Sequence, residues 1–324
     1  MKNRLIMELS QRKTEHAIKL IKDTFQKQLS AFLHLQRVTA PLFVKADSGI
    51  NDTLNGEKPV SFYVPALDCN CEIVQSLAKW KRLKLAEMDV KPDYGIYTDM
   101  NAIRPNEDLD ELHSLYVDQW DWEKVITDSQ FDNGGLTCLS YVIRIYDVIK
   151  NTDYILREQY PELGETFLPD MIYPMSSDML AAKYPDLDPK NQEFEFCKEY
   201  KAVFISKIGG THHDGMRAPD YDDWEKNGDI LIWSPILNMP IEISSMGIRV
   251  NSESLNKQLE YSGHQDWKKY EYHQKVLNNE LPLTIGGGIG QSRLCMLLLQ
   301  KHHIGEVQVS VWPDGEKDTY ENIL

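Results

Sequence analysis

Acidic and basic side chains occur in segments of this sequence whose residue pattern predicts β-strands. Asp229 starts one such segment, and Glu242 lies in the next. If these strands pair, the two carboxylates lie close together and need a cation between them, for which Mg²⁺ bound to carboxylate and phosphate oxygens is the usual occupant. The second segment also carries Ser244, Ser245 and Arg249, which add two hydroxyls and a guanidinium.

A second group of polar residues alternates with tryptophans. Gln119, Asp121 and Glu123 are separated by Trp120 and Trp122. Because side chains alternate between the two faces of a strand, the three polar residues should share one face. This row predicts either a solvated face of the sheet or the floor of a polar pocket.

Residues 283–299, LTIGGGIGQSRLCMLLL, combine glycines, an arginine and an apolar run. The pattern predicts a strand that stops at the glycines and turns into a buried helix. Glycines such as Gly286 and Gly288 let a backbone approach a ligand closely. Arg293 would lie in the first helical turn, with a planar fork suited to phosphate. The alternative is a glycine-rich turn with a solvated arginine, and the segment is not a Walker A loop.

Further cations lie near the ends of expected elements. Arg104 closes a strand, and Lys79, Lys81 and Arg82 lie near a helix start. Together with the glycines and strand carboxylates, these cations are what binding a nucleoside triphosphate, Mg²⁺ and an acidic co-substrate requires. The alternative is a set of surface salt bridges worth about 0–1 kcal/mol each.

The elements that position these residues follow from hydrophobic periodicity. Short polar loops between strands favour antiparallel pairing. We therefore expect an α+β protein with an antiparallel sheet flanked by helices, forming one domain over residues 1–324. The expected helices are 11–33, 76–88, 136–159, 253–261 and 266–279. The expected strands are 36–44, 60–64, 71–74, 95–103, 114–123, 202–208, 229–233, 241–245 and 306–312, with a long loop at 209–228.

Composition restricts the function classes. The 324 residues carry a formal net charge of −15, which disfavours extensive nucleic-acid binding. No apolar run is long enough for a membrane span, and no signal peptide is evident, so we expect a cytoplasmic protein. The five scattered cysteines predict reduced thiols. His212, His213 and Asp214 are candidates for metal ligands, although histidines in loops are usually solvated.

Several motifs resemble the bacterial ammonia-dependent asparagine synthetase (aspartate–ammonia ligase) family, which has the catalytic fold of class II aminoacyl-tRNA synthetases. The resemblance covers essentially the whole chain. It rests on VQSLAKWKR at 74–82, YVDQWDWE at 116–123, RAPDYDDW at 217–224, NGDILIW at 227–233, EISSMGIRV at 242–250 and TIGGGIGQSR at 284–293.

The resemblance implies roles in binding ATP. Arg104 would bind the α-phosphate, and Arg293 would contact the triphosphate and adenine ends of a bent ATP. Asp229 and Glu242 would hold Mg²⁺ on the phosphates. Asp222, Gly286 and Gly288 complete the expected ATP site.

The resemblance also implies an aspartate site. Lys81 and Arg249 would bind carboxylates, Asp121 would bind the amine, and Ser244 and Ser245 would lie nearby. Gln119 would hydrogen-bond the acyl or phosphoryl oxygen. Asp52, in a loop that closes over the amino acid, would contact the amine or ammonia and could act as a base if desolvation raises its pKa.

The implied reaction adenylates the β-carboxylate of aspartate, after which ammonia displaces AMP. We expect no N-terminal anticodon-binding barrel before the helix at residue 11, so tRNA is not the expected acceptor. Glutamine-dependent asparagine synthetases carry an N-terminal cysteine nucleophile, whereas residue 2 here is Lys, so free ammonia is expected instead of glutamine. Pro41 matches a dimer-interface proline, which implies a homodimer. The alternatives are a paralogue that transfers aspartate to tRNA or protein, and a catalytically silent ligand-sensing dimer.

Overall fold

The computed structural model describes residues 9–52, 57–209, 217–320 and 322–324. Its main sheet has eight strands, which run in the order β1-β5-β6-β11-β10-β9-β8-β7. They are β1 (Leu35–Arg37), β5 (Gly95–Ile103), β6 (Tyr116–Val125), β7 (Tyr173–Ser176), β8 (Ala202–Ser206), β9 (Asp222–Ser234), β10 (Met239–Arg249) and β11 (Thr284–Gly290). The inner strands pair antiparallel, and the edge pairs β1–β5 and β7–β8 are parallel. The predicted α+β class with a mainly antiparallel sheet is confirmed.

Three helices cover one face of this sheet, α1 (Gln11–Leu33), α4 (Gly134–Gln159) and α9 (Gln291–Leu298). The apolar stripe of α1 buries Ile21, Phe25 and Leu29 completely. The Phe25 and Trp120 ring centroids lie 4.6 Å apart, which joins α1 to the centre of the sheet. This large core holds the strands rigidly and leaves their other face for a site.

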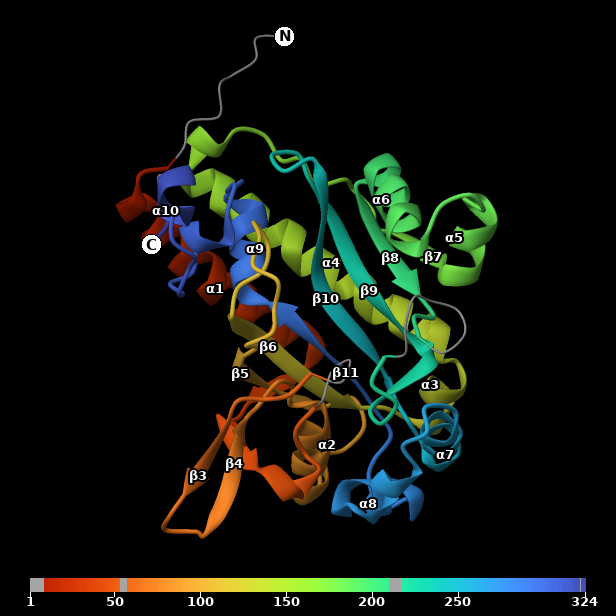
Figure 1. Cartoon of the computed structure of the whole chain (residues 1–324). Coiled ribbons are helices and arrows are strands. Elements are labelled where there is room, and N and C mark those ends of the chain that lie inside the picture. Colours follow the sequence, from red (N-terminus) through yellow and green to blue (C-terminus); the bar gives the residue numbers. More distant parts are fainter. Residues whose placement is uncertain (1–8, 53–56, 210–216, 321) are drawn as a thin grey trace.

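The opposite face is covered at its two ends (Figure 1). Near β5 and β6 lies α2 (Ala78–Glu87), and near β7 and β8 lie α5 (Ser177–Lys183) and α6 (Pro189–Tyr200). The remaining strands and α-helices are the small sheet β2 (Phe43–Lys45), β3 (Ser61–Val64) and β4 (Cys69–Ile73), and the helices α3 (Asp128–Asp132), α7 (Ser252–Tyr261), α8 (Glu271–Leu277) and α10 (Glu316–Thr319).

The strand predicted at 306–312 is wrong. The chain there forms a short 3₁₀ helix, Ile304–Glu306, and then irregular structure. The reason is visible at Gln308, whose amide donates to Ser292 Oγ at 3.0 Å. The segment therefore satisfies polar groups at the start of α9 instead of joining a sheet.

Other predicted boundaries also differ. The segment predicted as a strand at 36–44 is divided between β1 and β2, with Pro41 between them, because proline cannot donate to a ladder. Strand β9 begins at Asp222, inside the predicted loop. The predicted helix 266–279 is broken at Tyr270, whose backbone is extended. The glycines of β11 lie within the strand and not after its end.

The composition led to expectations about the cysteines and about membrane spans. All five cysteines are free thiols, as predicted. Among the described helices, none combines the length and the apolar character needed to cross a bilayer. His212, His213 and Asp214 lie outside the described residues.

Candidate active site

A cavity of about 910 Å³ lies on the face of the sheet opposite α1 and α4. Most of the predicted site residues line it, although they come from elements far apart in the sequence. They are Arg104, Gln119, Asp121, Asp222, Asp229, Glu242, Ser245, Arg249, Gly288 and Arg293. The number of charged side chains indicates a polar, charged ligand.

The polar row of β6 forms part of the cavity floor. Gln119 and Asp121 face the cavity, whereas Trp120 and Trp122 are fully buried on the helical side. Trp122 stacks on Tyr141 of α4 with ring centroids 5.9 Å apart. Of the two interpretations of this row, the structure supports the pocket floor.

A network of buried ion pairs lies under one end of the cavity. Lys81, from α2, pairs with Asp121 and donates to the Trp122 carbonyl at 2.8 Å. The Arg249 guanidinium donates to Glu123 Oε2 at 2.7 Å and also pairs with Asp222. Both cations are at most 2% exposed, so the low dielectric strengthens these pairs.

The pKa values of these carboxyls differ with their partners. Burial raises the pKa of Asp121, and the nearby Lys81 opposes this rise. Burial would raise the pKa of Glu123 as well, but Arg249 and Lys81 together hold it below its ordinary value. Glu123 is therefore the firm counter-ion of both cations, while Asp121 is held less strongly as a carboxylate and faces the cavity.

The glycines of β11 make room for these polar side chains. A Cβ on Gly286 would collide with the Glu123 carboxylate, and a Cβ on Gly288 would collide with the Gln119 amide. Gly286 is thus required by protein packing and does not line the cavity, whereas Gly288 does. The groups that lie close to the Gly286 backbone are the side chains of Glu123 and Arg249, whereas a ligand was expected there.

Two loosely held arginines lie at other parts of the wall. Arg293, in the first turn of α9, donates to the Glu242 carbonyl at 3.3 Å and lies 3.9 Å from its carboxylate. Arg104, just after β5, lies 4.0 Å from Glu107. Both side chains are partly exposed, so they can turn towards an anionic ligand.

Asp229 and Glu242 lie on the neighbouring strands β9 and β10, as predicted. One oxygen of Asp229 pairs with Arg217, and the other, Oδ1, is buried without a hydrogen-bond partner among the described residues. Burial, opposed by Arg217 and assisted by Glu242, raises the pKa of Asp229 to about 7. A hard divalent cation fits this pair, because carboxylate oxygens are its preferred protein ligands.

Some predicted residues lie elsewhere. Ser244 is on the opposite face of β10, beside Ile289, because a bulge between Glu242 and Ser244 interrupts the alternation. Lys81 lies below the cavity wall, bound to protein carboxylates. Asp52 is buried and hydrogen-bonds Tyr221, which lines the cavity.

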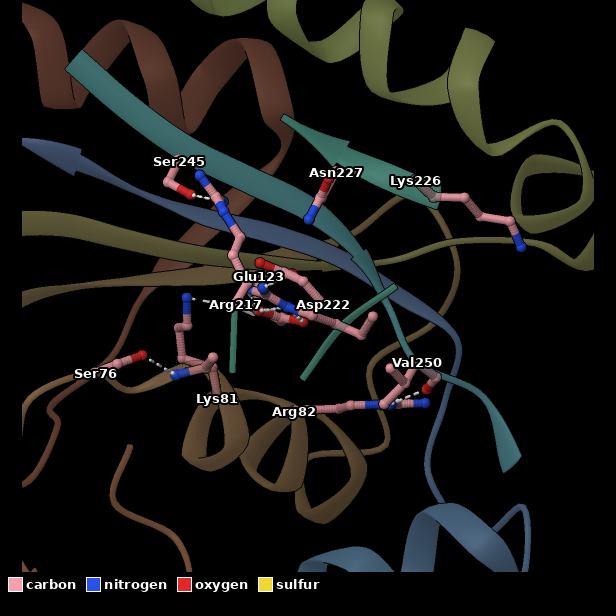
Figure 2. A network of polar contacts seen from close by, with 12 residues as sticks. Ser76, Lys81, Arg82, Glu123, Arg217, Asp222, Lys226, Asn227, Ser245 and Val250 are labelled. Atoms are coloured by element: carbon pink, nitrogen blue, oxygen red, sulfur yellow. Dashed lines mark hydrogen bonds and ion pairs between the residues drawn. The ribbon is translucent and has the colours of Figure 1, made fainter. Parts of the chain in front are cut away.

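The sequence reasoning missed several residues of this site. Arg217 donates to Ser245 Oγ at 2.7 Å (Figure 2). Its guanidinium also pairs with Asp229. Asp220, which is buried next to the cavity-lining Tyr221, pairs with Lys79 at 2.7 Å and with His273 at 3.0 Å. Burial alone would raise the Asp220 pKa, but these partners lower it to about 2. The density of charges in RAPDYDDW was the available signal, although spacing alone does not reveal such distant partners.

The fold resembles that of class II aminoacyl-tRNA synthetases. Asparaginyl-tRNA synthetase from Pyrococcus horikoshii, complexed with asparaginyl-adenylate, has a TM-score of 0.66 and 13% identity over 93% of this chain and 70% of its own. The Entamoeba histolytica asparaginyl-tRNA synthetase has a TM-score of 0.64 and 14% identity, covering 92% of this chain and 66% of its own. At these identities the likeness concerns the fold alone.

Sequence comparison identifies the family. The family model for aspartate–ammonia ligase matches residues 12–323. The aspartate–ammonia ligase of Pediococcus pentosaceus is 51% identical over 322 residues, covering 97% of this chain and 95% of that protein. That of Fusobacterium nucleatum is 52% identical over 305 residues, covering 92% of each. The chain belongs to the aspartate–ammonia ligase family.

Proposed function

We propose that this protein makes L-asparagine from L-aspartate, ammonia and ATP through a β-aspartyl-AMP intermediate, and releases AMP and pyrophosphate. The observation that carries the proposal is the convergence of Arg104, Arg293, Asp229 and Glu242 on one cavity with Asp121 and Arg249. The two loosely held arginines of this cavity are suited to binding phosphates, and its network of buried ion pairs is suited to binding an amino acid.

ATP solves the chemical problem that a carboxylate is a poor acceptor for ammonia. The aspartate β-carboxylate oxygen attacks the α-phosphorus, and the bond to the pyrophosphate oxygen breaks. Arg104 and Arg293 stabilise the charge that develops on the phosphoryl group and the leaving pyrophosphate. Ammonia then forms a bond to the acyl carbon, and the acyl bond to AMP breaks.

The carboxylates of β9 and β10 are proposed to hold Mg²⁺. Asp229 and Glu242 would bind the ion together with phosphate oxygens of ATP. When bound, Mg²⁺ would neutralise phosphate charge and favour departure of pyrophosphate. Arg217 would keep Asp229 oriented, since it already bridges this carboxylate to Ser245.

The remaining roles concern aspartate and ammonia. We propose that Asp121 binds the amine of aspartate and that Arg249 attracts a carboxylate, while Lys81 fixes Asp121. Asp52, buried beside Tyr221, is the proposed acceptor of the proton that ammonium must lose before it attacks. Gln119 would hydrogen-bond the reacting acyl or phosphoryl oxygen.

Product analysis tests the proposal. Purified protein with labelled ATP, aspartate and ammonium should yield asparagine, AMP and pyrophosphate, and glutamine should not replace ammonium. ADP and phosphate would reject the adenylate route. Labelled aspartate retained on tRNA would favour the aspartyl-transferring alternative.

We also propose that the protein is a cytoplasmic homodimer. The free thiols support the cytoplasmic location, and the exposed apolar residues near Pro41 support the homodimer.

A further inference from the structure

Gln75 has a buried side chain, and both polar atoms of this side chain lack hydrogen-bond partners among the described residues. It is 0% exposed, and neither Oε1 nor Nε2 has a hydrogen-bond partner among the described residues. It lies between β4 and α2 and lines the cavity, close to Ser76 and Ala78. Buried carboxamides are normally hydrogen-bonded, because leaving them unpaired costs their full desolvation penalty. An exception that faces a cavity indicates a ligand.

The position of Gln75 is fixed by its backbone. The Gln75 amide N–H donates to Asn51 Oδ1 at 2.9 Å, and the Asp52 N–H donates to the same oxygen at 3.0 Å. The Asn51 side-chain amide in turn donates to the Ile73 carbonyl at 3.1 Å. These bonds fix the backbone of Gln75, and the donors and the acceptor of its carboxamide take no part in them.

The chemistry of the carboxamide restricts its ligand. It offers one acceptor oxygen and two N–H donors, and it carries no charge. Phosphates only accept hydrogen bonds, and ammonium only donates them, so each would leave half of the carboxamide unpaired. The head group of an α-amino acid presents an ammonium and a carboxylate side by side, which matches both halves.

The neighbours of Gln75 favour the same ligand. The helix that follows it, α2, carries Lys81, which pairs with Asp121 of the cavity floor. This end of the cavity is the one where the proposed function puts aspartate, whereas Arg293 and Glu242 mark the nucleotide end. A neutral residue at position 75 also leaves the charge balance of the buried ion pairs unchanged.

We propose that Gln75 binds the α-amino acid head group of aspartate: Oε1 accepts from the ammonium and Nε2 donates to the α-carboxylate. This inference rests on the proposed function and adds a substrate-specificity residue to it. It explains why a costly unpaired group is kept in the ligand-free protein, since the group is satisfied only when substrate binds.

The test compares Gln75→Met with Gln192→Met. Methionine keeps the shape of glutamine but lacks its hydrogen bonds. Gln192 is also buried, but its amide is already satisfied by the Tyr184 and Leu187 carbonyls at 3.1 and 2.8 Å. Calorimetric titration of each purified variant with L-aspartate and with ATP measures binding without turnover.

We expect Gln75→Met to raise the Kd for aspartate about tenfold or more, as for the loss of hydrogen bonds to charged groups, and to change the Kd for ATP less than twofold. The thermal midpoint of ligand-free Gln75→Met should rise, because an unpaired polar group is removed. Gln192→Met should do the reverse, lowering the midpoint and leaving aspartate binding unchanged.

Two further ligands test the amine contact and the α-carboxylate contact of Gln75 separately. Succinate lacks the amine and β-alanine lacks the α-carboxylate, so Gln75→Met should weaken each of them less than aspartate. Aspartate binding within twofold of the unmodified protein, or an equal loss of ATP binding, would overturn the role of Gln75. Absence of aspartate binding in the unmodified protein would instead count against the proposed function itself.

Discussion

At the scale of single residues, the arginines of the cavity differ in how firmly they are held. Arg249 and Arg217 are bound by carboxylates, and their guanidinium groups are largely committed to the protein. Arg104 and Arg293 have one long ion pair each, and their side chains are 22% and 25% exposed. The loosely held pair can turn to phosphate without leaving a buried carboxylate unpaired.

Arg104→Ala should therefore impair catalysis and leave folding intact. We expect pyrophosphate release to slow by about 10²-fold or more, as for the loss of one preorganised donor to a developing negative charge. The thermal midpoint should change little, because Arg104 is partly exposed and weakly paired. The control is Arg144→Ala on α4, an exposed arginine outside the cavity. A near-normal rate in Arg104→Ala would remove this residue from the mechanism.

The carboxyl of Asp229 predicts a pH dependence for cation binding. With its pKa raised to about 7, the group is largely protonated below this pH, and a proton competes with Mg²⁺ for the same oxygens. The apparent affinity for Mg²⁺ in the presence of ATP should rise about tenfold per pH unit up to about pH 7 and then level off.

Titration of Mg²⁺ at pH 5.5 to 8.5, with correction for protonation of ATP, measures this dependence. Asp229→Asn cannot titrate, so its weaker binding should lose the steep part of the curve. The same slope in Asp229→Asn as in the unmodified protein would show that another group is responsible.

Spacing along strands placed many of these residues correctly, for a physical reason. Side chains on β6 alternate strictly, so Gln119 and Asp121 could be assigned to one face before the structure was known. The same rule fails at Ser244, because the bulge in β10 changes the face between Glu242 and Ser244. Gln75 was missed because only its surroundings, and not its sequence context, distinguish it.

At the scale of elements, the glycines allow β11 to continue directly into α9. They also leave room for the polar side chains of the neighbouring strand β6, which lie over the face of β11. The start of α9 is held by Asp118, whose Oδ1 accepts from the Ser292 N–H at 3.0 Å. Lys22 of α1 donates to the other carboxylate oxygen at 3.0 Å. This contact, between elements distant in sequence, fixes the helix that carries Arg293.

Asp118→Asn should consequently affect nucleotide binding more than aspartate binding. The uncharged amide would pair less strongly with Lys22 and with the positive end of the helix dipole. We expect the KM for ATP to rise about threefold to tenfold, consistent with a loss of about 1 kcal/mol of positioning. Asp153→Asn, which removes the comparable ion pair with Arg157 outside the cavity, is the control. Equal changes in the KM values for ATP and aspartate would argue for a general loss of structure.

Element order and type were predictable wherever one strong periodicity covered the segment. The apolar stripe of α1 and the long apolar pattern of α4 were sufficient for both helices. The C-terminal segment was not predictable in this way, because its conformation depends on Gln308 reaching Ser292 across the fold. The small sheet was found as single strands, but the division of 36–44 between two sheets required the tertiary structure.

At the scale of the whole molecule, the acidic charge and the exposed apolar residues act in opposite directions. A net charge of −15 makes copies of the chain repel one another, so association needs a compensating apolar contact. Leu42 and Phe43 are 52% and 48% exposed, next to Pro41, and Phe43 packs edge-on against Phe62 with ring centroids 5.3 Å apart. These residues form a surface suited to a second copy.

The double variant Leu42→Lys, Phe43→Lys should therefore be monomeric if this surface forms the proposed homodimer, because charged groups would be buried without partners in the interface. Sedimentation velocity at several protein concentrations measures the change. Leu136→Lys is the matched control, since Leu136 is 72% exposed on α4, away from the small sheet. A double variant that still sediments as a dimer would move the interface elsewhere, and an unmodified protein that is monomeric at every concentration would remove the homodimer from the proposed function.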